Sequence, residues 1–308
     1  MFEAFARNLQ TKPGVGERRS DARTALVFLA PWILGLVLLT ALPMIASAAL
    51  SFTNYDLLST PRWVGTANYQ RLFTRDTRYF NALEVTTVYV LISVPLSVAV
   101  ALIIAVTLAS TSRVANFFRS VFYLPSLLGG SVAIGVLWRQ IFGADGLINT
   151  ILAPLGIAGT SWVGDPRYAL WTLILLHVWQ FGAPMVIFLA GVRQIPKELV
   201  EATIVDGANP FQRFFLITLP LLSPLILFNL VMQTITAFQA FAPAYIISDG
   251  SGGPVDSTLF YTLYLYIEGF RNFRMGYAMA MAWVLLLIIS VFTAIAFYSS
   301  RFWVHYES

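Results

Sequence analysis

The chain has 308 residues, of which 58% are hydrophobic and only 11% are charged, and its mean hydropathy is +0.74. A soluble globular domain carries about 25% charged residues, so this composition excludes that class and indicates a protein whose solvent is lipid. The lack of cysteine excludes a disulfide framework and a thiolate metal site, and a formal charge of +4 without a long basic run gives no sign of nucleic-acid binding.

Six apolar stretches are long enough to cross about 30 Å of hydrocarbon as helices, which predicts an all-α membrane protein with six transmembrane helices. They lie near Thr24–Leu50, Leu83–Leu108, Phe117–Leu137, Tyr168–Ala190, Leu219–Ala244 and Gly276–Phe302. A further stretch, Ser257–Phe270, is aromatic and only partly apolar. Its tyrosines favour a short interfacial or re-entrant helix, although it could instead extend the last span.

The first apolar stretch follows the basic residues Arg18, Arg19 and Arg23, so two interpretations are open. One is a signal peptide, with 46–48 (Ala-Ser-Ala) as a small-residue cleavage site. The other is a signal anchor that is retained as the first span. Cleaved signals usually have an apolar run of about 7–15 residues, and the longer run here favours the anchor.

The predicted fourth span carries His177, Trp179 and Gln180 within one helical turn. A proton relay needs a partner acid or base at the same depth, but Glu84 lies at the edge of the second span and Glu268 lies outside the sixth. The pattern therefore argues against an ion-coupled transporter. We expect a neutral His177 that forms a hydrogen bond with a neighbour or a solute.

A polar segment at about 194–220 separates the fourth and fifth spans and has the sequence signals of a helix, a turn and a second helix. Pro196 suits a first helical position, and Gly207 suits the left-handed residue that closes a helix. Asn209 can cap the next helix, with Pro210 at its first position. Such a hairpin on a membrane face is typical of a docking element for another protein, and the alternative is an ordinary amphipathic loop.

The predicted fifth span carries a stripe of polar residues, Asn229, Gln233, Thr236 and Gln239, whose spacing places them along one helical face. Their amide and hydroxyl groups both donate and accept hydrogen bonds, as the hydroxyls of a sugar require. Phe238 and Phe241 lie nearby in the sequence, and we expect both to be able to stack on the apolar face of a sugar ring. The stripe therefore predicts a solute pathway, and the alternative is that it joins neighbouring helices.

The sequence contains no catalytic constellation. It has no phosphate-binding Gly-rich loop that ends in Lys-Ser/Thr, no His-Glu-x-x-His and no Gly-x-Ser-x-Gly. We therefore predict no enzyme activity, no metal and no cofactor. If the chain takes part in ATP-driven transport, hydrolysis must occur on another polypeptide.

The polar segment resembles the "EAA" signature of permease subunits of binding-protein-dependent ABC importers. Glu201-Ala202-Thr203 is followed after three residues by Gly207 and, after nine more, by 217–220 (Ile-Thr-Leu-Pro). The third position alone departs, with Thr203 in place of Ala. Further likenesses to carbohydrate-uptake permeases of the maltose type (MalF-like) extend over about 51–302, at 51–53 (Ser-Phe-Thr), 63–65 (Trp-Val-Gly), 123–125 (Tyr-Leu-Pro), 137–139 (Leu-Trp-Arg) and 275–278 (Met-Gly-Tyr-Ala).

This resemblance implies the type I permease fold and a set of partners. These are a second, similar permease, two ATP-binding subunits, an extracytoplasmic solute-binding protein, a sugar substrate and the lipid bilayer. The residues implied for coupling to the ATP-binding subunits are Glu201, Ala202, Asp206, Gly207 and Pro220. The sugar contacts implied by alignment fall at or beside His177, Gln180, Gln233, Ala237 and Ala240, where the two alanines replace expected asparagines.

The location implied is the cell inner membrane, with both termini in the cytoplasm. Of the 19 Lys and Arg residues, eleven would then lie inside, so the positive-inside bias is weak and the orientation rests on the EAA-like loop. The predicted division is a cytoplasmic segment at 1–23, a permease domain at 24–302 with its coupling loop at about 194–220, and a cytoplasmic tail at 303–308. Open alternatives are import of glycerol phosphate or another polyol derivative and a non-transporting membrane scaffold.

Overall fold

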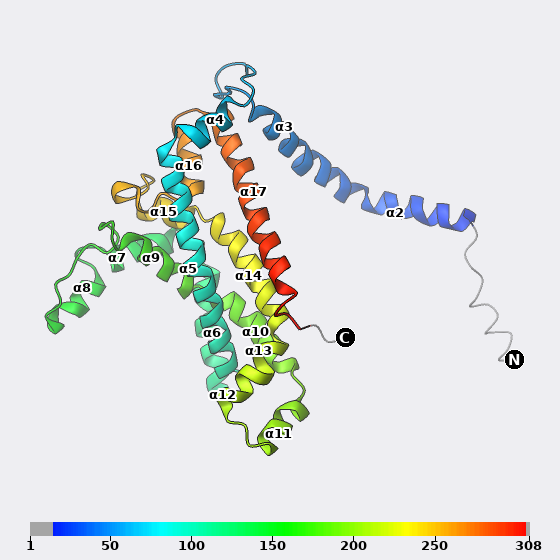
Figure 1. The fold of residues 1–308 in the computed structure, drawn as a ribbon, viewed down its shortest axis with the longest axis vertical. Coiled ribbons are helices and arrows are strands. Elements are labelled where there is room, and N and C mark those ends of the chain that lie inside the picture. Colours follow the sequence, from blue (N-terminus) through cyan, green and yellow to red (C-terminus); the bar gives the residue numbers. More distant parts are fainter. Residues whose placement is uncertain (1–14, 306–308) are drawn as a thin grey trace.

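The computed structural model describes residues 15–305, and its regular elements are helices (Figure 1). The first group comprises α2 (Val15–Leu36), α3 (Leu42–Leu50), α4 (Ala67–Thr74), α5 (Thr77–Thr107), α6 (Arg113–Leu128), α7 (Val132–Ile141) and α8 (Leu147–Leu152). The second comprises α9 (Ala169–Trp179), α10 (Gly182–Gln194), α11 (Lys197–Val205), α12 (Pro210–Arg213), α13 (Leu219–Leu221), α14 (Ser223–Phe238), α15 (Ala242–Ile247), α16 (Tyr261–Tyr266) and α17 (Met275–Ser300). The all-α prediction is confirmed.

Four stretches are long and apolar enough to cross a membrane as helices, namely Val27–Leu50, Thr77–Thr107, Ala169–Gln194 and Met275–Ser300. The third predicted span is instead the pair α6 and α7, which are bent by 105° across the glycines at 129 and 130. The segment Pro210–Leu221 meets α14 at 68°, where Pro224 cannot donate a backbone hydrogen bond. The predicted six spans result only if each bent pair counts as one span. The predicted cytoplasmic segments include 1–14 and 306–308, which lie outside the described residues.

The first apolar helix stands away from the rest of the molecule (Figure 1, blue). It runs from α2 through a π-helical turn, Val37–Ala41, into α3, and none of its most apolar 18-residue window is buried. Its C-terminal part contacts α17, where the indole N–H of Trp283 donates to Ser47 Oγ at 3.2 Å. Its apolar surface is therefore left for lipid or for another chain.

Helix α5 is the centre of the bundle and packs against α9, α10, α14 and α16. Small residues at four-residue intervals form one of its faces, and Ser93, Ser97, Ala101 and Ala105 are each 0% exposed. Small side chains allow neighbouring helices to approach closely, which is how helices associate in a solvent as apolar as their own side chains. The long apolar run of α5 thus supports packing on several sides.

The predicted aromatic helix near 257–270 is present as α16 followed by a π-helical turn, Ile267–Arg271. It is tied to its neighbours through Asp76, the N-cap of α5, which is 9% exposed. The Asp76 carboxylate accepts hydrogen bonds from the hydroxyls of Tyr264 (2.6 Å) and Tyr277 (2.5 Å) and from the backbone N–H of Tyr79 (3.0 Å). One carboxylate therefore joins the starts of α5 and α17 to α16.

Two opposing effects set the pKa of Asp76. Burial, the largest single effect, raises the pKa, whereas the hydrogen bonds from Tyr264, Tyr277 and Tyr79 lower it. The hydrogen bonds together outweigh burial, so the pKa lies below the ordinary value of 3.8. Because the folded-state pKa is lower than the unfolded value, ionised Asp76 stabilises the fold fully above about pH 4. This stabilisation is lost as the pH falls through the lowered folded-state pKa.

We expect Asp76→Ala to lower the thermal unfolding midpoint of the purified protein at pH 7 by several degrees. It leaves buried donors unpaired, each at a cost of about 1–3 kcal/mol. Asp145→Ala, which removes an exposed carboxylate, is the control and should change little. The difference between wild type and Asp76→Ala should shrink below pH 4, and a difference that is constant down to pH 3 would contradict the role of the ionised carboxylate.

Candidate functional site

Three breaks between helices meet at one cavity of about 420 Å³. Gly129 and Gly130 come from the break between α6 and α7, Gln180 from the break between α9 and α10, and 239–241 from the break between α14 and α15. Interrupted helices leave backbone groups unpaired, and at membrane depth these are tolerated only beside protein or a polar cavity. The cavity thus gives the three helix breaks a polar surrounding.

His177 and Gln180 supply polar side chains from the same turn of the chain. His177 packs edge-on against the ring of Tyr89, with 5.7 Å between ring centroids, and its buried Nε2 atom has no hydrogen-bond partner among the described residues. Gln180 lies over Gly129, where a Cβ atom would overlap the Gln180 amide. An unpartnered imidazole nitrogen beside a cavity is a group that a polar solute could satisfy.

The structure brings together four of the six predicted pathway residues and separates the other two. His177, Gln180, Thr236 and Gln239 line the cavity. Asn229 is 2% exposed and donates to the backbone carbonyl of Leu225 at 2.9 Å, one turn back along its own helix. Gln233 is half-buried and does not line the cavity.

The two candidate stacking residues also differ. Phe241 lines the cavity, but Phe238 is 1% exposed and packs against Phe292, with 5.0 Å between ring centroids. The prediction for Phe238 is therefore wrong, because its side of α14 faces α17. Of the two small residues, Ala240 lines the cavity and Ala237 is buried.

Sequence reasoning missed Tyr89 and the pair Gly129–Gly130 as lining residues. A tyrosine within the apolar run of α5 was a usable signal, because its hydroxyl needs a partner at membrane depth. The adjacent glycines were the other signal, since two glycines in an apolar stretch favour a break in the helix.

The polar segment between α10 and α14 is the predicted helical hairpin. α11 ends at Val205 with Asp206 as its C-cap, Gly207 has a left-handed φ of +77°, and Asn209 caps α12 with Pro210 at its first position. These three predictions are confirmed, whereas Pro196 is the N-cap of α11 and not its first residue. The hairpin also contains a capping box that was not predicted, in which Gln212 N–H donates to Asn209 Oδ1 (2.8 Å) and Asn209 N–H donates to Gln212 Oε1 (2.9 Å).

The residues predicted for coupling lie on and after this hairpin. Glu201 and Ala202 are exposed on α11, Asp206 and Gly207 form the turn, and Pro220 lies in α13. Apolar side chains are exposed beside them, notably Val205 (86%), Phe211 (72%) and Ile204 (54%). Exposed apolar groups on a polar hairpin are typical of a protein contact surface.

Thr203, the departure from the signature, fits the hairpin without strain. Its hydroxyl donates to the carbonyl of Val200 at 2.7 Å, so the polar atom is satisfied within the helix. A cavity of about 660 Å³ lies beside α11, and its lining includes Glu201 and Ile204 of α11 and Thr111 of the link between α5 and α6. The hairpin therefore packs loosely against the bundle.

Comparison with known proteins identifies the chain. Residues 77–303 match the family described as "Binding-protein-dependent transport system inner membrane component". The chain belongs to this family. Over 291 residues the permease is 54% identical to the "Probable ABC transporter permease protein YesP" of Bacillus subtilis (strain 168), with 94% of each chain covered.

Two further comparisons agree with this membership. The permease is 32% identical to the "Lactose transport system permease protein LacF" of Rhizobium radiobacter, with 89% of this chain and 93% of that one covered. A solved chain of a bacterial alginate ABC transporter in complex with an alginate pentasaccharide-bound periplasmic protein superimposes with a TM-score of 0.78 at 20% identity. That match covers 93% of this chain and 97% of the other, and it shows that the fold is that of an ABC importer permease.

We expect Asn209→Ala to loosen the hairpin, because it removes the acceptor of the capping box at a cost of about 1 kcal/mol. Amide hydrogen exchange across 197–213 should become roughly fivefold faster, as measured by mass spectrometry. Asn209→Asp keeps an acceptor for the Gln212 N–H and should exchange nearly as the wild type. Equal exchange in all three proteins would show that the cap does not hold the hairpin.

Proposed function

We propose that this permease translocates a sugar or oligosaccharide across the cytoplasmic membrane as one subunit of an ABC importer, driven by ATP hydrolysis on partner subunits. The observation that carries the proposal is the meeting of three helix breaks at one polar cavity. We place both termini and the hairpin in the cytoplasm and the loops at the N-terminal end of α5 outside. The permease domain then covers 24–302.

The chemistry of the cavity supports a hydroxyl-rich solute. His177, Gln180, Thr236 and Gln239 offer donors and acceptors, and Phe241 offers an aromatic face. Relatives are named for lactose, arabinooligosaccharides and starch degradation products. A phosphorylated polyol would favour Arg or Lys beside it, and the described residues that line this cavity include neither, so that alternative is not favoured.

Two features support a second permease as partner. The first helix stands away from the bundle with its apolar surface uncovered, so it can lie along a neighbouring chain in the membrane. The cavity at the three breaks is only partly enclosed by this chain, and a similar chain facing it would complete a closed pathway. Asn229 and Gln233 do not line the cavity in this conformation. We propose that they reach the solute pathway in another conformation, in which α14 rotates toward the second permease.

The hairpin supports docking of two ATP-binding subunits, one beneath each permease. Glu201 and Ala202 would face the partner, Asp206 and Gly207 would form the turn, and Pro220 would begin the connection to the membrane. Closure of the ATP-binding subunits would move the hairpin, and the bends at α13 and α14 would pass this motion to the cavity. Such coupling requires ATP to bind one conformation more tightly than the other.

Uptake of a panel of labelled sugars in cells with and without this chain tests the function. Deletion should abolish uptake of one sugar or oligosaccharide class, and that uptake should require ATP and persist when ion gradients are collapsed. Uptake that fails with the ion gradient would overturn the ABC mechanism. Normal uptake of every sugar after deletion would overturn the sugar assignment.

Adjacent glycines give a matched test of the cavity. In Gly129→Ala the new methyl group overlaps the flexible Gln180 side chain and displaces it, whereas a methyl group added at Gly130 meets no heavy atom within 4 Å. Neither glycine has a positive φ, so neither substitution strains the backbone. We expect uptake at low sugar concentration to fall about tenfold in Gly129→Ala, mainly through KM, and to be unchanged in Gly130→Ala at equal membrane levels.

A further inference from the structure

Strained backbone in the described residues gathers at one end of the molecule. The non-glycine residues with left-handed φ are Leu57 (71°), Asp249 (50°), Val255 (53°), Asp256 (56°) and Phe273 (53°). All of them lie in the loops before α4, after α15 and before α17, at the N-terminal end of α5 (Figure 1). A left-handed φ is unfavourable for bulky and β-branched residues and persists only where the surroundings impose it.

Three of these strained residues are apolar and exposed. The exposed fractions are 89% for Val255, 47% for Phe273 and 42% for Leu57. We call Leu57, Val255 and Phe273 the apolar tips. Burial does not explain their conformation, since each presents its side chain outward.

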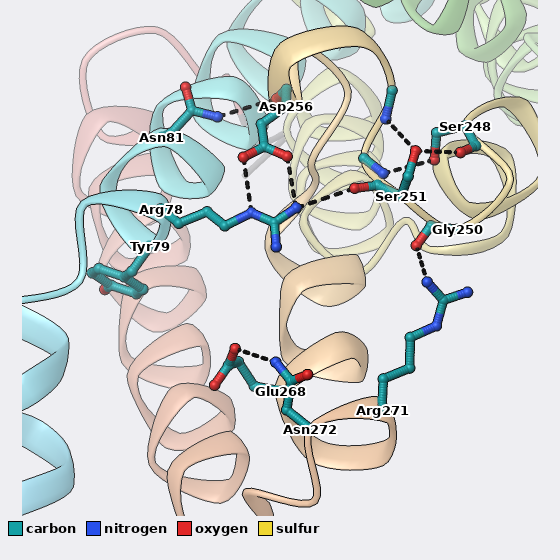
Figure 2. Close-up of polar contacts among 12 residues, drawn as sticks. Arg78, Tyr79, Asn81, Ser248, Gly250, Ser251, Asp256, Glu268, Arg271 and Asn272 are labelled. Atoms are coloured by element: carbon teal, nitrogen blue, oxygen red, sulfur yellow. Dashed lines mark hydrogen bonds and ion pairs between the residues drawn. The ribbon is translucent and has the colours of Figure 1, made fainter.

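A polar tie beside each tip imposes this conformation. Next to Val255, the Asp256 carboxylate accepts from Arg78 Nε at 2.8 Å and Nη2 at 2.7 Å, and its backbone carbonyl accepts from Asn81 at 3.1 Å (Figure 2). The other end of this loop is held by Arg271, which donates to the carbonyl of Gly250 at 2.8 Å. The loop is fixed on both sides of Val255.

Phe273 is held in the same way. Its two neighbours in the sequence both bind the buried carboxylate of Glu268. Asn272 Nδ2 donates to Glu268 Oε1 at 2.7 Å, and Arg274 Nη1 donates to Glu268 Oε2 at 3.0 Å. Glu268 is 3% exposed. With both neighbours turned inward, Phe273 is turned outward.

Leu57 follows Asp56, whose Oδ1 accepts from the N–H of Leu58 at 3.0 Å and of Ser59 at 2.7 Å. This loop is joined to the start of α17, because Gly276 N–H donates to the carbonyl of Tyr55 at 2.8 Å. A small cavity of about 210 Å³ between the two loops is lined by Tyr55 and Phe273, among others. The tip at Phe273 therefore lines a hollow that it shares with the loop carrying Leu57.

Lipid does not account for the exposure of these tips. Irregular backbone and half-exposed arginines are excluded from hydrocarbon, so this end projects into water. The 31 residues of α5 also span about 46 Å at 1.5 Å per residue, well beyond an apolar core of about 30 Å. Apolar groups held outward in water at a cost in strain indicate a surface made for a protein partner.

We infer that the apolar tips Leu57, Val255 and Phe273 form a preformed docking surface for the extracytoplasmic solute-binding protein. The inference rests on the proposed function for the orientation of the chain and for the existence of that partner. The occupant is chosen by position, since the surface lies at the opposite end from the hairpin, and by membership of a family that depends on a binding protein. Because Asp256 is paired with Arg78 and Glu268 with Arg274, the tips at Val255 and Phe273 offer mainly apolar contact.

The absence of cysteine makes a direct test simple. Val255→Cys, Leu57→Cys and Phe273→Cys each place a single thiol in the assembled importer, and Val205→Cys places one on the hairpin as a topology control. Intact cells are treated first with a membrane-impermeant maleimide and, separately, with a photoactivatable maleimide crosslinker. Crosslinked proteins are identified by mass spectrometry.

We expect labelling from outside at the three tips and not at 205, and crosslinking of the tips to a solute-binding protein. Outside labelling with crosslinks only to the second permease, or to no binding protein, would overturn the docking surface and leave the importer intact. Labelling at 205 but not at the tips would overturn the orientation, and with it the proposed function. The three positions are independent, so failure of one variant to accumulate leaves two that decide the result.

Glycine variants separate contact from structure. Val255→Gly removes the tip and also relieves the left-handed strain, so the fold should be equally or more stable. We expect the binding protein identified by crosslinking to bind the importer in nanodiscs about tenfold more weakly, as for a central interface residue. Leu287→Ala, which shortens a 62% exposed side chain within α17, should bind as the wild type. Unchanged affinity in Val255→Gly, Leu57→Gly and Phe273→Gly would overturn the inference.

Discussion

Hydrocarbon offers no hydrogen bond to a backbone amide or carbonyl, and each unpaired group costs several kcal/mol there. This constraint accounts for the helical architecture and for where that architecture is interrupted. The breaks after Leu128, Trp179 and Phe238 all open onto one cavity. Interruptions that would be costly against lipid are thus collected where polar groups are useful, and the described residues that line this site include no Asp, Glu, Lys or Arg.

The two ends of the bundle are built differently. At the end that holds the start of α5, Asp76, Asp256 and Glu268 join helices and loops that are far apart in the sequence, through contacts with Tyr264, Arg78 and Arg71 respectively. At the other end the hairpin is held mainly by its own caps, and it lies beside a cavity. In the proposed mechanism, the braced end is a fixed platform and the hairpin is the part that moves.

The exclusion of unpaired backbone from hydrocarbon also decides how an exposed apolar side chain is interpreted. Exposed apolar residues are numerous along α2, α3 and α17, where lipid or a second chain covers them. In the loops near α4 and α16 that explanation fails, because irregular backbone does not enter hydrocarbon. The exposure of Val255 therefore indicates a contact with a protein partner, whereas the exposure of Leu287 is explained by lipid or a second chain.

The sequence by itself determined the membrane class, the helical content and the hairpin. These depend on composition and on local signals, such as Gly207 with its positive φ and the Asn209-Pro210 start of α12, which act over a few residues. It also identified His177 and Gln180 as candidate pathway residues, because a polar side chain at membrane depth is costly and indicates a packing or functional role. Only the tertiary structure decided which polar residues share a cavity. A helical period places Asn229 and Thr236 on one face, but which neighbour covers each level depends on the bends at other helices. The ties from Arg78 to Asp256 and from Asp76 to Tyr277 join residues more than 170 positions apart, which is beyond what a local pattern can encode.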